Sequence, residues 1–448
     1  MVYILSSVFI LLTSFFLFKK VAGSLIPTKP NMISYIFYYN IFLQVFIGSV
    51  LSILLLDKHY VISSVGMDVR FYAWLAVMYT MIALPLGMMV SKRVCVGKKR
   101  VDSLLDNYVR KDLDVNGLNG KALKYSVWCF TGTSILACMY TFYVIGYFPF
   151  YKALTSSSAE LTSLRISVSR NFSGNVYVRN FLGLAVMPIM AYAWTFYALA
   201  SKKFLDTVMA AICFIFSASI LYYSFEKSPL LWFLLSFIFV FYYARGKIKF
   251  SYIVGMFFVV LLLILLMYGF KGESISDFIS YNSGPIGRVI LGQAAGLFII
   301  FDLFPSEHDF IGLSSLSRFL ADVFNYQYID RAARIAMEEF NPSGVAEGEA
   351  GVMNSLFIAE AWANFGLIGV LAAPFWVGFL IHSLYTFFLR RPKSPLNLAF
   401  FVSFSIGGSV TGGVNDYIYN PGVLMMVFLF SIIMGLAIFF NMLAKSAK

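Results

Sequence analysis

The chain has 448 residues, of which 60% are hydrophobic, 18% aromatic and only 12% charged. Soluble globular proteins are about 45–50% apolar and about 25% charged, so this composition excludes an ordinary soluble domain. A chain with 48 Phe and 28 Tyr also has too much apolar surface to remain disordered. The composition therefore predicts a membrane protein, whose formal net charge of +12 is divided between the two sides of a bilayer.

Eleven apolar runs predict helices that cross the membrane. A hydrocarbon core of about 30 Å takes roughly 17–25 apolar residues per helix, because backbone groups in lipid must be hydrogen-bonded within the protein. The runs are residues 2–18, 32–56, 71–90, 125–147, 181–200, 207–225, 230–244, 251–270, 364–389, 396–414 and 423–444. The sequence thus predicts an all-α, polytopic membrane protein that forms one integral membrane domain over residues 1–448.

The basic residues predict an orientation. Lys19 and Lys20 follow the first apolar run instead of preceding it, so we expect no cleavable signal peptide and an outer amino terminus. If successive connections alternate between the two sides from there, one side holds 22 basic residues (Lys and Arg) and 5 acidic residues (Asp and Glu). The other side holds 12 basic and 17 acidic residues. The first side, at about +17 (22 minus 5), is cytoplasmic by the positive-inside rule, and the outer side is at −5 (12 minus 17).

Two outer loops, residues 148–180 and 271–363, are much longer than the other connections. Long loops in compact domains usually carry function. Residues 289–304 in the second loop are apolar but short, and a full crossing there would move the basic cluster at 390–393 to the outer side. We therefore expect a re-entrant or interfacial helix at 289–304.

Charge is concentrated in the outer loops and is nearly absent from the apolar runs. An ion-driven transporter is expected to carry more charge within its spans. The two long outer loops contain seven Arg and two Lys, and a guanidinium binds phosphate or carboxylate with two parallel hydrogen bonds. This pattern suits a lipid diphosphate bound at the outer surface by preorganised donors. We expect no metal, no cofactor and no nucleic-acid partner.

Among the arginines, Arg288 is the strongest candidate for a functional role. It follows a Gly-Pro-Ile-Gly turn and opens an apolar segment, where a charge at the membrane boundary needs a partner. Arg165 and Arg170 could bind a substrate or contact only lipid head groups. Arg334 stands four residues before Glu338, so the two could simply form a surface helix pair.

Glu360 and Asn364 stand four residues apart at the outer end of the ninth run, so on a helix they share one face. In one interpretation both act in the site. In the other, Asn364 caps a helix and Glu360 is an acid that favours a helix amino terminus.

Three stretches in the last third of the chain resemble a known enzyme family. They are Gly-Arg-Val-Ile-Leu-Gly-Gln-Ala-Ala-Gly-Leu at 287–297, Phe-Asn-Pro-Ser-Gly at 340–344, and a run at 351–369 that contains Glu-Ala-Trp-Ala-Asn-Phe-Gly. They resemble the Wzy-type oligosaccharide repeat-unit polymerases of bacterial O-antigen and capsule assembly. The run at 360–366 is the most specific part. Such enzymes show eleven to fourteen spans and two large periplasmic loops with functional arginines.

The resemblance implies a metal-independent glycosyltransferase in the bacterial inner membrane. At the periplasmic face, it would move a growing glycan from undecaprenyl diphosphate to the non-reducing end of a new lipid-linked repeat unit. The reaction needs stabilisation of the diphosphate charge and, in one interpretation, a base for the acceptor hydroxyl. The expected site residues are Arg288 on the diphosphate, Arg318 or Arg334 and Arg165 or Arg170 as further contacts, Glu360 or else Glu349 as base or acceptor orienter, and Gln293 and Asn364 on sugar hydroxyls.

Two other functions stay open at this point. An O-antigen ligase would use the same donor with a lipid A core as acceptor, and composition does not separate the two enzymes. A flippase or transporter for lipid-linked oligosaccharides would show two similar halves and a charged central path. Expected partners are undecaprenyl-diphosphate-linked oligosaccharides, membrane lipid and a chain-length-regulating co-polymerase.

Overall fold

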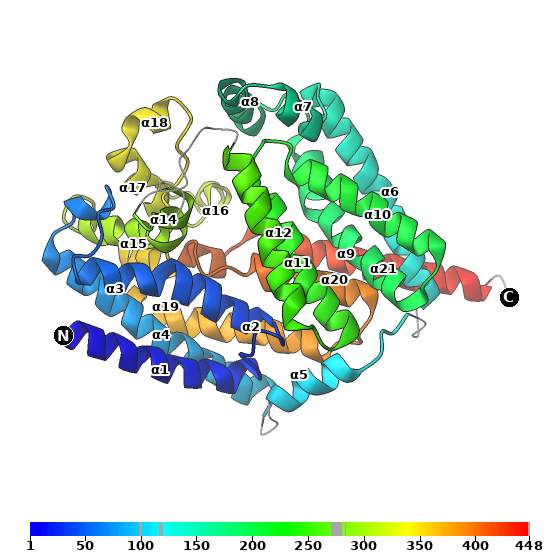
Figure 1. Cartoon of the computed structure of the whole chain (residues 1–448), viewed down its shortest axis with the longest axis horizontal. Coiled ribbons are helices and arrows are strands. Elements are labelled where there is room, and N and C mark those ends of the chain that lie inside the picture. Colours follow the sequence, from blue (N-terminus) through cyan, green and yellow to red (C-terminus); the bar gives the residue numbers. More distant parts are fainter. Residues whose placement is uncertain (98–100, 116–119, 270–279, 283, 447–448) are drawn as a thin grey trace.

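The computed structural model shows an almost entirely helical chain (Figure 1). The structure describes residues 1–97, 101–115, 120–269, 280–282 and 284–446. Over these residues, β-structure is confined to one isolated antiparallel bridge between Leu356 and Thr411. The predicted all-α class is confirmed.

Each of the eleven predicted runs forms helix. In chain order the helices are α1 (Val2–Ala22), α2 (Met32–Tyr35) continued by η1 (Ile36–Phe46) and α3 (Ile47–Ile53), α4 (Met67–Cys95), α6 (Gly120–Ile145), η3 (Val178–Val186) continued by α9 (Met187–Ser201), α10 (Phe204–Leu221), α11 (Lys227–Arg245), α12 (Phe250–Gly269), α19 (Phe357–Arg390), α20 (Pro395–Gly407) and α21 (Pro421–Ser446).

Counted over the described residues, nine helical segments are long and apolar enough to span a membrane, or ten with a bent pair. They include all the predicted runs except α12 and α20. The structure is that of a polytopic membrane protein, and the predicted number of eleven spans is not confirmed.

The connections between the long helices contain short helices. They are η2 (Ile62–Ser64), α5 (Val101–Arg110), α7 (Pro149–Thr155), α8 (Ser158–Arg170), α14 (Gly284–Ile290), α15 (Gly292–Leu303), α16 (Arg318–Phe324), α17 (Ala332–Phe340), α18 (Pro342–Ala346) and η4 (Val414–Tyr417). Figure 1 places α7 and α8 at the upper edge, α17 and α18 at the upper left, and α5 at the lower edge. The described short helices of the first long loop and the helix of the basic loop therefore lie at different edges of the molecule (Figure 1).

The predicted re-entrant segment consists of two helices. α14 and α15 meet at Leu291 at a bend of 53°. Only the two helices together are long and apolar enough to span a membrane. Such a bent pair is either a broken span or a re-entrant loop. Gly296 allows a close contact with the chain before α19, because a Cβ there would overlap the backbone carbonyl of Asn354. Gly292 lies at the bend, where an added Cβ would lie 4.0 Å from the Arg288 Cβ atom.

Close contact between α4 and α19 depends on two glycines. A Cβ on Gly87 would overlap the backbone of Phe375, and one on Gly378 would overlap the carbonyl of Leu84. In lipid, where apolar burial gives little drive for helix association, small residues allow the close packing that holds helices together. α1 joins this pair through a hydrogen bond from the Ser14 hydroxyl to the Met81 carbonyl, at 2.8 Å.

An aromatic cluster fixes α20 in the other half of the bundle. Phe401 stacks on Tyr243 of α11 and Phe388 of α19, with ring centroids 4.8 and 5.2 Å apart. Tyr108 of α5 and Tyr385 of α19 complete the cluster at 6.2 and 6.0 Å. Each such pair contributes about 0.5–1.5 kcal/mol beyond the burial of its area. The cluster holds α20 in place, so the next part of the chain starts from a fixed point.

Candidate functional site

Three departures from regular α-helix meet in one place. They are the π-helix η1 of 11 residues, the bend at Leu291, and the end of α20 at Gly407, seven residues before the predicted run ends. π-helical turns are rare in proteins overall, and those that occur often lie at functional sites. Irregular backbone within a membrane bundle is tolerated where it is buried in protein or lines a cavity.

These departures line a cavity of about 430 Å³, which we call the polar cavity. It lies between η1, α11, the α14–α15 bend and the chain after α20. Its lining residues are Tyr35, Tyr39, Gln44, Ser228, Trp232, Arg288, Val289, Gln293, Ile406, Gly407, Ser409 and Thr411. Aromatic walls with a few converging polar groups are typical of small-molecule sites.

Arg288 and Gln293 contribute unused hydrogen-bonding capacity to the polar cavity. Within the described part of the chain, the exposed Arg288 side chain has neither a carboxylate within 4.0 Å nor a hydrogen bond. The Gln293 Oε1 atom is buried and has no hydrogen-bond partner among the described residues. A guanidinium without an acidic neighbour is available to an anion, and a buried amide oxygen is available to a hydroxyl donor.

Aromatic rings form another wall of the polar cavity. The Trp232 ring lies 4.5 Å from that of Tyr39 and 5.7 Å from that of Tyr35, and the two tyrosines stack at 5.4 Å. Gln44 donates to the Tyr39 hydroxyl at 3.2 Å and accepts from the Asn40 amide at 2.9 Å. Flat apolar faces beside amides and hydroxyls fit a sugar, which has apolar C–H faces and a polar rim.

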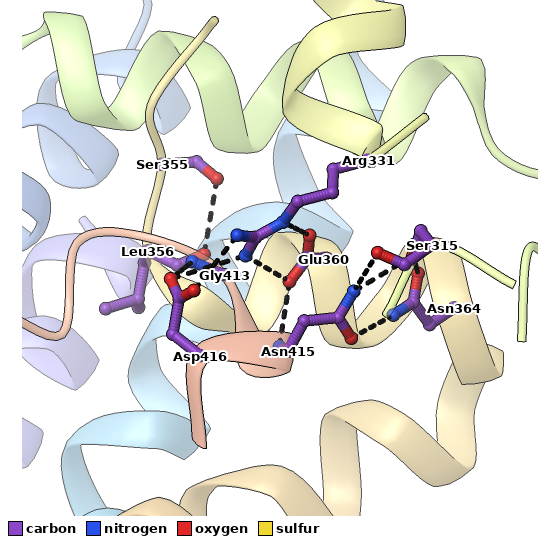
Figure 2. Close-up of polar contacts among 9 residues, drawn as sticks. All are labelled: Ser315, Arg331, Ser355, Leu356, Glu360, Asn364, Gly413, Asn415 and Asp416. Carbon is purple, nitrogen blue, oxygen red and sulfur yellow. Dashed lines mark hydrogen bonds and ion pairs between the residues drawn. The ribbon is translucent and has the colours of Figure 1, made fainter. Parts of the chain in front are cut away.

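An ion-pair network, drawn in Figure 2, lies beside the polar cavity. Arg331 donates to both carboxylate oxygens of Glu360, at 2.6 and 2.9 Å, and to both of Asp416, at 3.0 and 3.3 Å. Burial lowers the pKa of the Arg331 guanidinium. Hydrogen bonds and Coulomb attraction from the two carboxylates together raise that pKa by more than burial lowers it, so the net shift is upward. Glu360 is almost fully buried, with 2% of its side chain exposed, against 39% for Asp416.

Two asparagines extend the network. The Asn415 backbone N–H donates to Glu360 at 2.9 Å, and its side chain donates to the Ser315 hydroxyl, also at 2.9 Å. Asn364 donates to the Asn415 side-chain oxygen at 2.9 Å (Figure 2). The network therefore joins α19, the second outer loop and the chain between α20 and α21.

One segment connects the network to the polar cavity. Residues 408–416, which we call the connecting segment, place Ser409 and Thr411 at the cavity and Asp416 on Arg331. Between them, Gly413 lies so close to the ion pair that a Cβ would overlap both Arg331 and Glu360. The Arg331 network therefore fixes the backbone that presents two cavity hydroxyls.

Four of the predicted site residues are brought together in pairs. Arg288 and Gln293 line the polar cavity, while Glu360 and Asn364 both contact Asn415. α19 begins at Phe357, seven residues before the predicted start, so Glu360 lies in its first turn and Asn364 is not its cap.

The other four predicted arginines do not line the polar cavity. Arg165 pairs with Glu226 at 3.4 Å, and Arg318 pairs with Asp330 at 3.3 Å. Arg334 pairs with Glu338 at 2.6 Å, as the surface-pair interpretation expects. Arg170 donates to the Ala350 carbonyl at 3.0 Å, which ties the first outer loop to the second. Glu349 is exposed and lines neither the cavity nor the network.

The sequence also contains signals for further residues of the cavity and the network. Asn40 and Gln44 are amides four residues apart inside an apolar run, and both are buried. Polar side chains at such positions need partners inside the bundle, so their spacing indicates a buried polar site. Arg331 and Asp416 stood among the charged outer residues, but their spacing of 85 residues gave no sign that they meet.

Within the described residues, no three His, Cys, Asp or Glu side chains lie close enough together to hold a metal ion. Comparisons of the chain with protein-family models, with curated proteins and with solved structures found no match.

Proposed function

We propose that the protein is a Wzy-type glycosyltransferase that polymerises undecaprenyl-diphosphate-linked repeat units at the periplasmic face of a bacterial inner membrane. The observation that carries the proposal is the polar cavity, where Arg288 and the Gln293 amide oxygen, neither with a partner among the described residues, lie with the rings of Tyr39 and Trp232. A guanidinium can bind a phosphate with two parallel hydrogen bonds, and the neighbouring aromatic and amide groups can contact a sugar. The cavity therefore matches a glycan linked to a diphosphate.

In the proposed reaction, an acceptor hydroxyl oxygen forms a bond to the anomeric carbon of the growing glycan. The bond from that carbon to the diphosphate oxygen breaks, undecaprenyl diphosphate leaves, and the hydroxyl proton is released to solvent. Arg288 stabilises the negative charge that develops on the diphosphate. Gln293, Ser409 and Thr411 hydrogen-bond sugar hydroxyls, and the aromatic wall aligns the glycan for attack.

Glu360 takes a positioning role in this proposal. Both of its oxygens accept from Arg331, and one also accepts from the Asn415 backbone, so little capacity remains to take a proton from an acceptor. With Arg331 and Asn364, it holds the connecting segment in place.

Deletion of the gene from its host, followed by analysis of lipid-linked and surface glycans, tests the function. The proposal expects single repeat units on the lipid carrier and loss of the glycan ladder, restored by the wild-type gene. Full-length polymer that stays on the carrier would identify a ligase instead, and the absence of any outer-face glycan would identify a flippase.

A further inference from the structure

A second cavity lies at the opposite end of α19 from the Arg331 network. Its volume is about 500 Å³, and its lining residues are Cys95, Ser383, Thr386, Phe387, Arg390, Arg391 and Pro392. These residues come from the ends of α4 and α19 and the turn directly after α19. We call this cavity the basic cavity.

The two arginines of the basic cavity have no acidic partner within the described part of the chain. Arg390 donates to the Cys95 carbonyl, and the Arg391 guanidinium lies 4.5 Å from the centre of the Phe387 ring. The partial negative charge at a helix carboxyl end accounts for part of the preference for a cation there. Two guanidiniums carry ten N–H donors, and the contacts with the helix end use few of them.

Lys393 shows what a basic residue does here when its role is structural. It is 3% exposed, and its ammonium donates to the carbonyls of Val109 and Lys111 at 2.8 and 2.6 Å. Its donors are used within the chain, while Arg391, two residues earlier, is exposed and makes no such bond among the described residues.

The surroundings of the basic cavity select an amphiphilic anion. α1 and α4 also end in basic residues, with Lys19 and Lys20 in the last turn of one and Lys92 and Arg93 in that of the other. These charges raise the local concentration of anions. Phe387 is 39% exposed and Pro392 is exposed, so an apolar wall adjoins the two guanidiniums.

We propose that the basic cavity binds the phosphate of a membrane lipid, with Arg390 and Arg391 on the phosphate oxygens and the lipid chains along Phe387. Basic pockets between helix ends on the cytoplasmic side of membrane proteins favour anionic lipid head groups. The site is separate from the polar cavity and does not depend on the function proposed for it. A phospholipid and a polyprenyl phosphate share the required chemistry.

Native mass spectrometry of the purified full-length protein tests this site. The protein is titrated with phosphatidylglycerol, with a polyprenyl phosphate, and with phosphatidylcholine as the lipid without net charge. We expect the double variant Arg390→Gln, Arg391→Gln to weaken binding of the anionic lipids by roughly 20- to 30-fold, because each arginine adds to attraction of an anionic head group. The corresponding double lysine variant should give an intermediate loss, since charge is kept and the fork is lost.

Arg245→Gln is the matched control, because Arg245 is also a basic residue in the last turn of a helix, lies over the Phe241 ring and is outside the basic cavity. Wild-type binding in this variant, with an unchanged melting temperature in all variants, supports the proposal. Tighter binding of the polyprenyl phosphate or of phosphatidylglycerol identifies the lipid. Equal loss in Arg245→Gln, unchanged binding in the double glutamine variant, or displacement of the lipid by millimolar inorganic phosphate would overturn it.

Discussion

Arg288 and Arg331 belong to the same long loop but have opposite surroundings. Arg331 is held by two carboxylates, while Arg288 has none within 4.0 Å in the described part of the chain. A guanidinium already paired with two carboxylates has little affinity left for a ligand. The two residues should therefore differ when mutated: Arg288 should affect the reaction, and Arg331 should affect the stability of the fold.

Replacing Arg288 with lysine should reduce chain extension by roughly tenfold to a hundredfold, because a point charge replaces a bidentate donor at the developing charge. The glycan ladder measures the effect, and the amount of protein in the membrane should not change. Arg318→Lys is the control, since Arg318 is equally basic, lies on the same loop and pairs with Asp330. Equal ladders from Arg288→Lys and wild type would remove Arg288 from the mechanism.

Replacing Arg331 with glutamine should lower the free energy of unfolding by about 3–5 kcal/mol, because Glu360 would then be a buried carboxylate without its cation. Asp416→Asn should cost less, since 39% of that side chain is exposed. Thermal unfolding in detergent compares the two variants. A smaller loss for Arg331→Gln than for Asp416→Asn would contradict the proposed role of the network.

Lys393 gives a pH dependence with a defined sign. Burial lowers the pKa of its ammonium from 10.5 to about 8, with a smaller opposing effect from Asp112. Between these two values the unfolded chain binds more protons than the folded one, so this group makes stability rise as pH increases through that window. Melting temperatures near pH 7.5 and 9.5 should show a gain that Lys393→Met lacks. An identical pH response in both proteins would refute this assignment.

The chain after α20 shows why helix boundaries were the weakest part of the sequence prediction. Residues 396–414 have span-like hydrophobicity, but Gly407 and Gly408 end the helix early, and Ser409 and Thr411 beyond them line the polar cavity. α19 starts before the predicted run and includes Glu360, a charged residue that is paired with Arg331. At α19 the contact that accounts for the boundary is distant in sequence, and a hydrophobicity pattern does not contain it.

Gly413 tests the connecting segment as an element. Its φ of −112° suits any residue, so Gly413→Ala should act only by pushing a methyl group into Arg331 and Glu360. We expect loss of most polymerising activity, because the segment that carries Ser409 and Thr411 must move. Gly435→Ala in α21 is the control, since a Cβ there meets nothing within 4 Å. Normal glycan ladders from Gly413→Ala would show that the position of the connecting segment does not matter.

At the scale of the whole molecule, the pattern of apolar runs predicted the class and the course of the chain well. Each of the eleven runs contains a helix, and Arg170 of the first long loop contacts Ala350 of the second. The convergence of η1, α11, α14 and the connecting segment on one cavity could not be predicted, because their contacts join residues up to 369 positions apart, as between Asn40 and Ser409. The side of the membrane on which each edge lies stays a prediction from charge.

Cysteine labelling tests that orientation. In a chain whose four native cysteines are replaced, Phe310→Cys should react with a membrane-impermeant maleimide added to intact cells with a permeabilised outer membrane. Pro392→Cys should react only after the inner membrane is disrupted, because we expect the basic cluster at 390–393 to be cytoplasmic. Both positions are exposed in the structure. The reverse labelling pattern would invert the topology and remove the site from the periplasmic face.

Photo-crosslinking of a lipid-linked repeat unit to the polar cavity tests the central claim most directly. A benzophenone amino acid replaces Trp232 on the cavity wall or, as control, Tyr143, which is 85% exposed on α6. In membranes that contain radiolabelled undecaprenyl-diphosphate-linked repeat units, label should attach at position 232, be much weaker at 143, and fall sharply when Arg288→Ala is added. Equal labelling at both positions, unaffected by Arg288→Ala, would contradict the account.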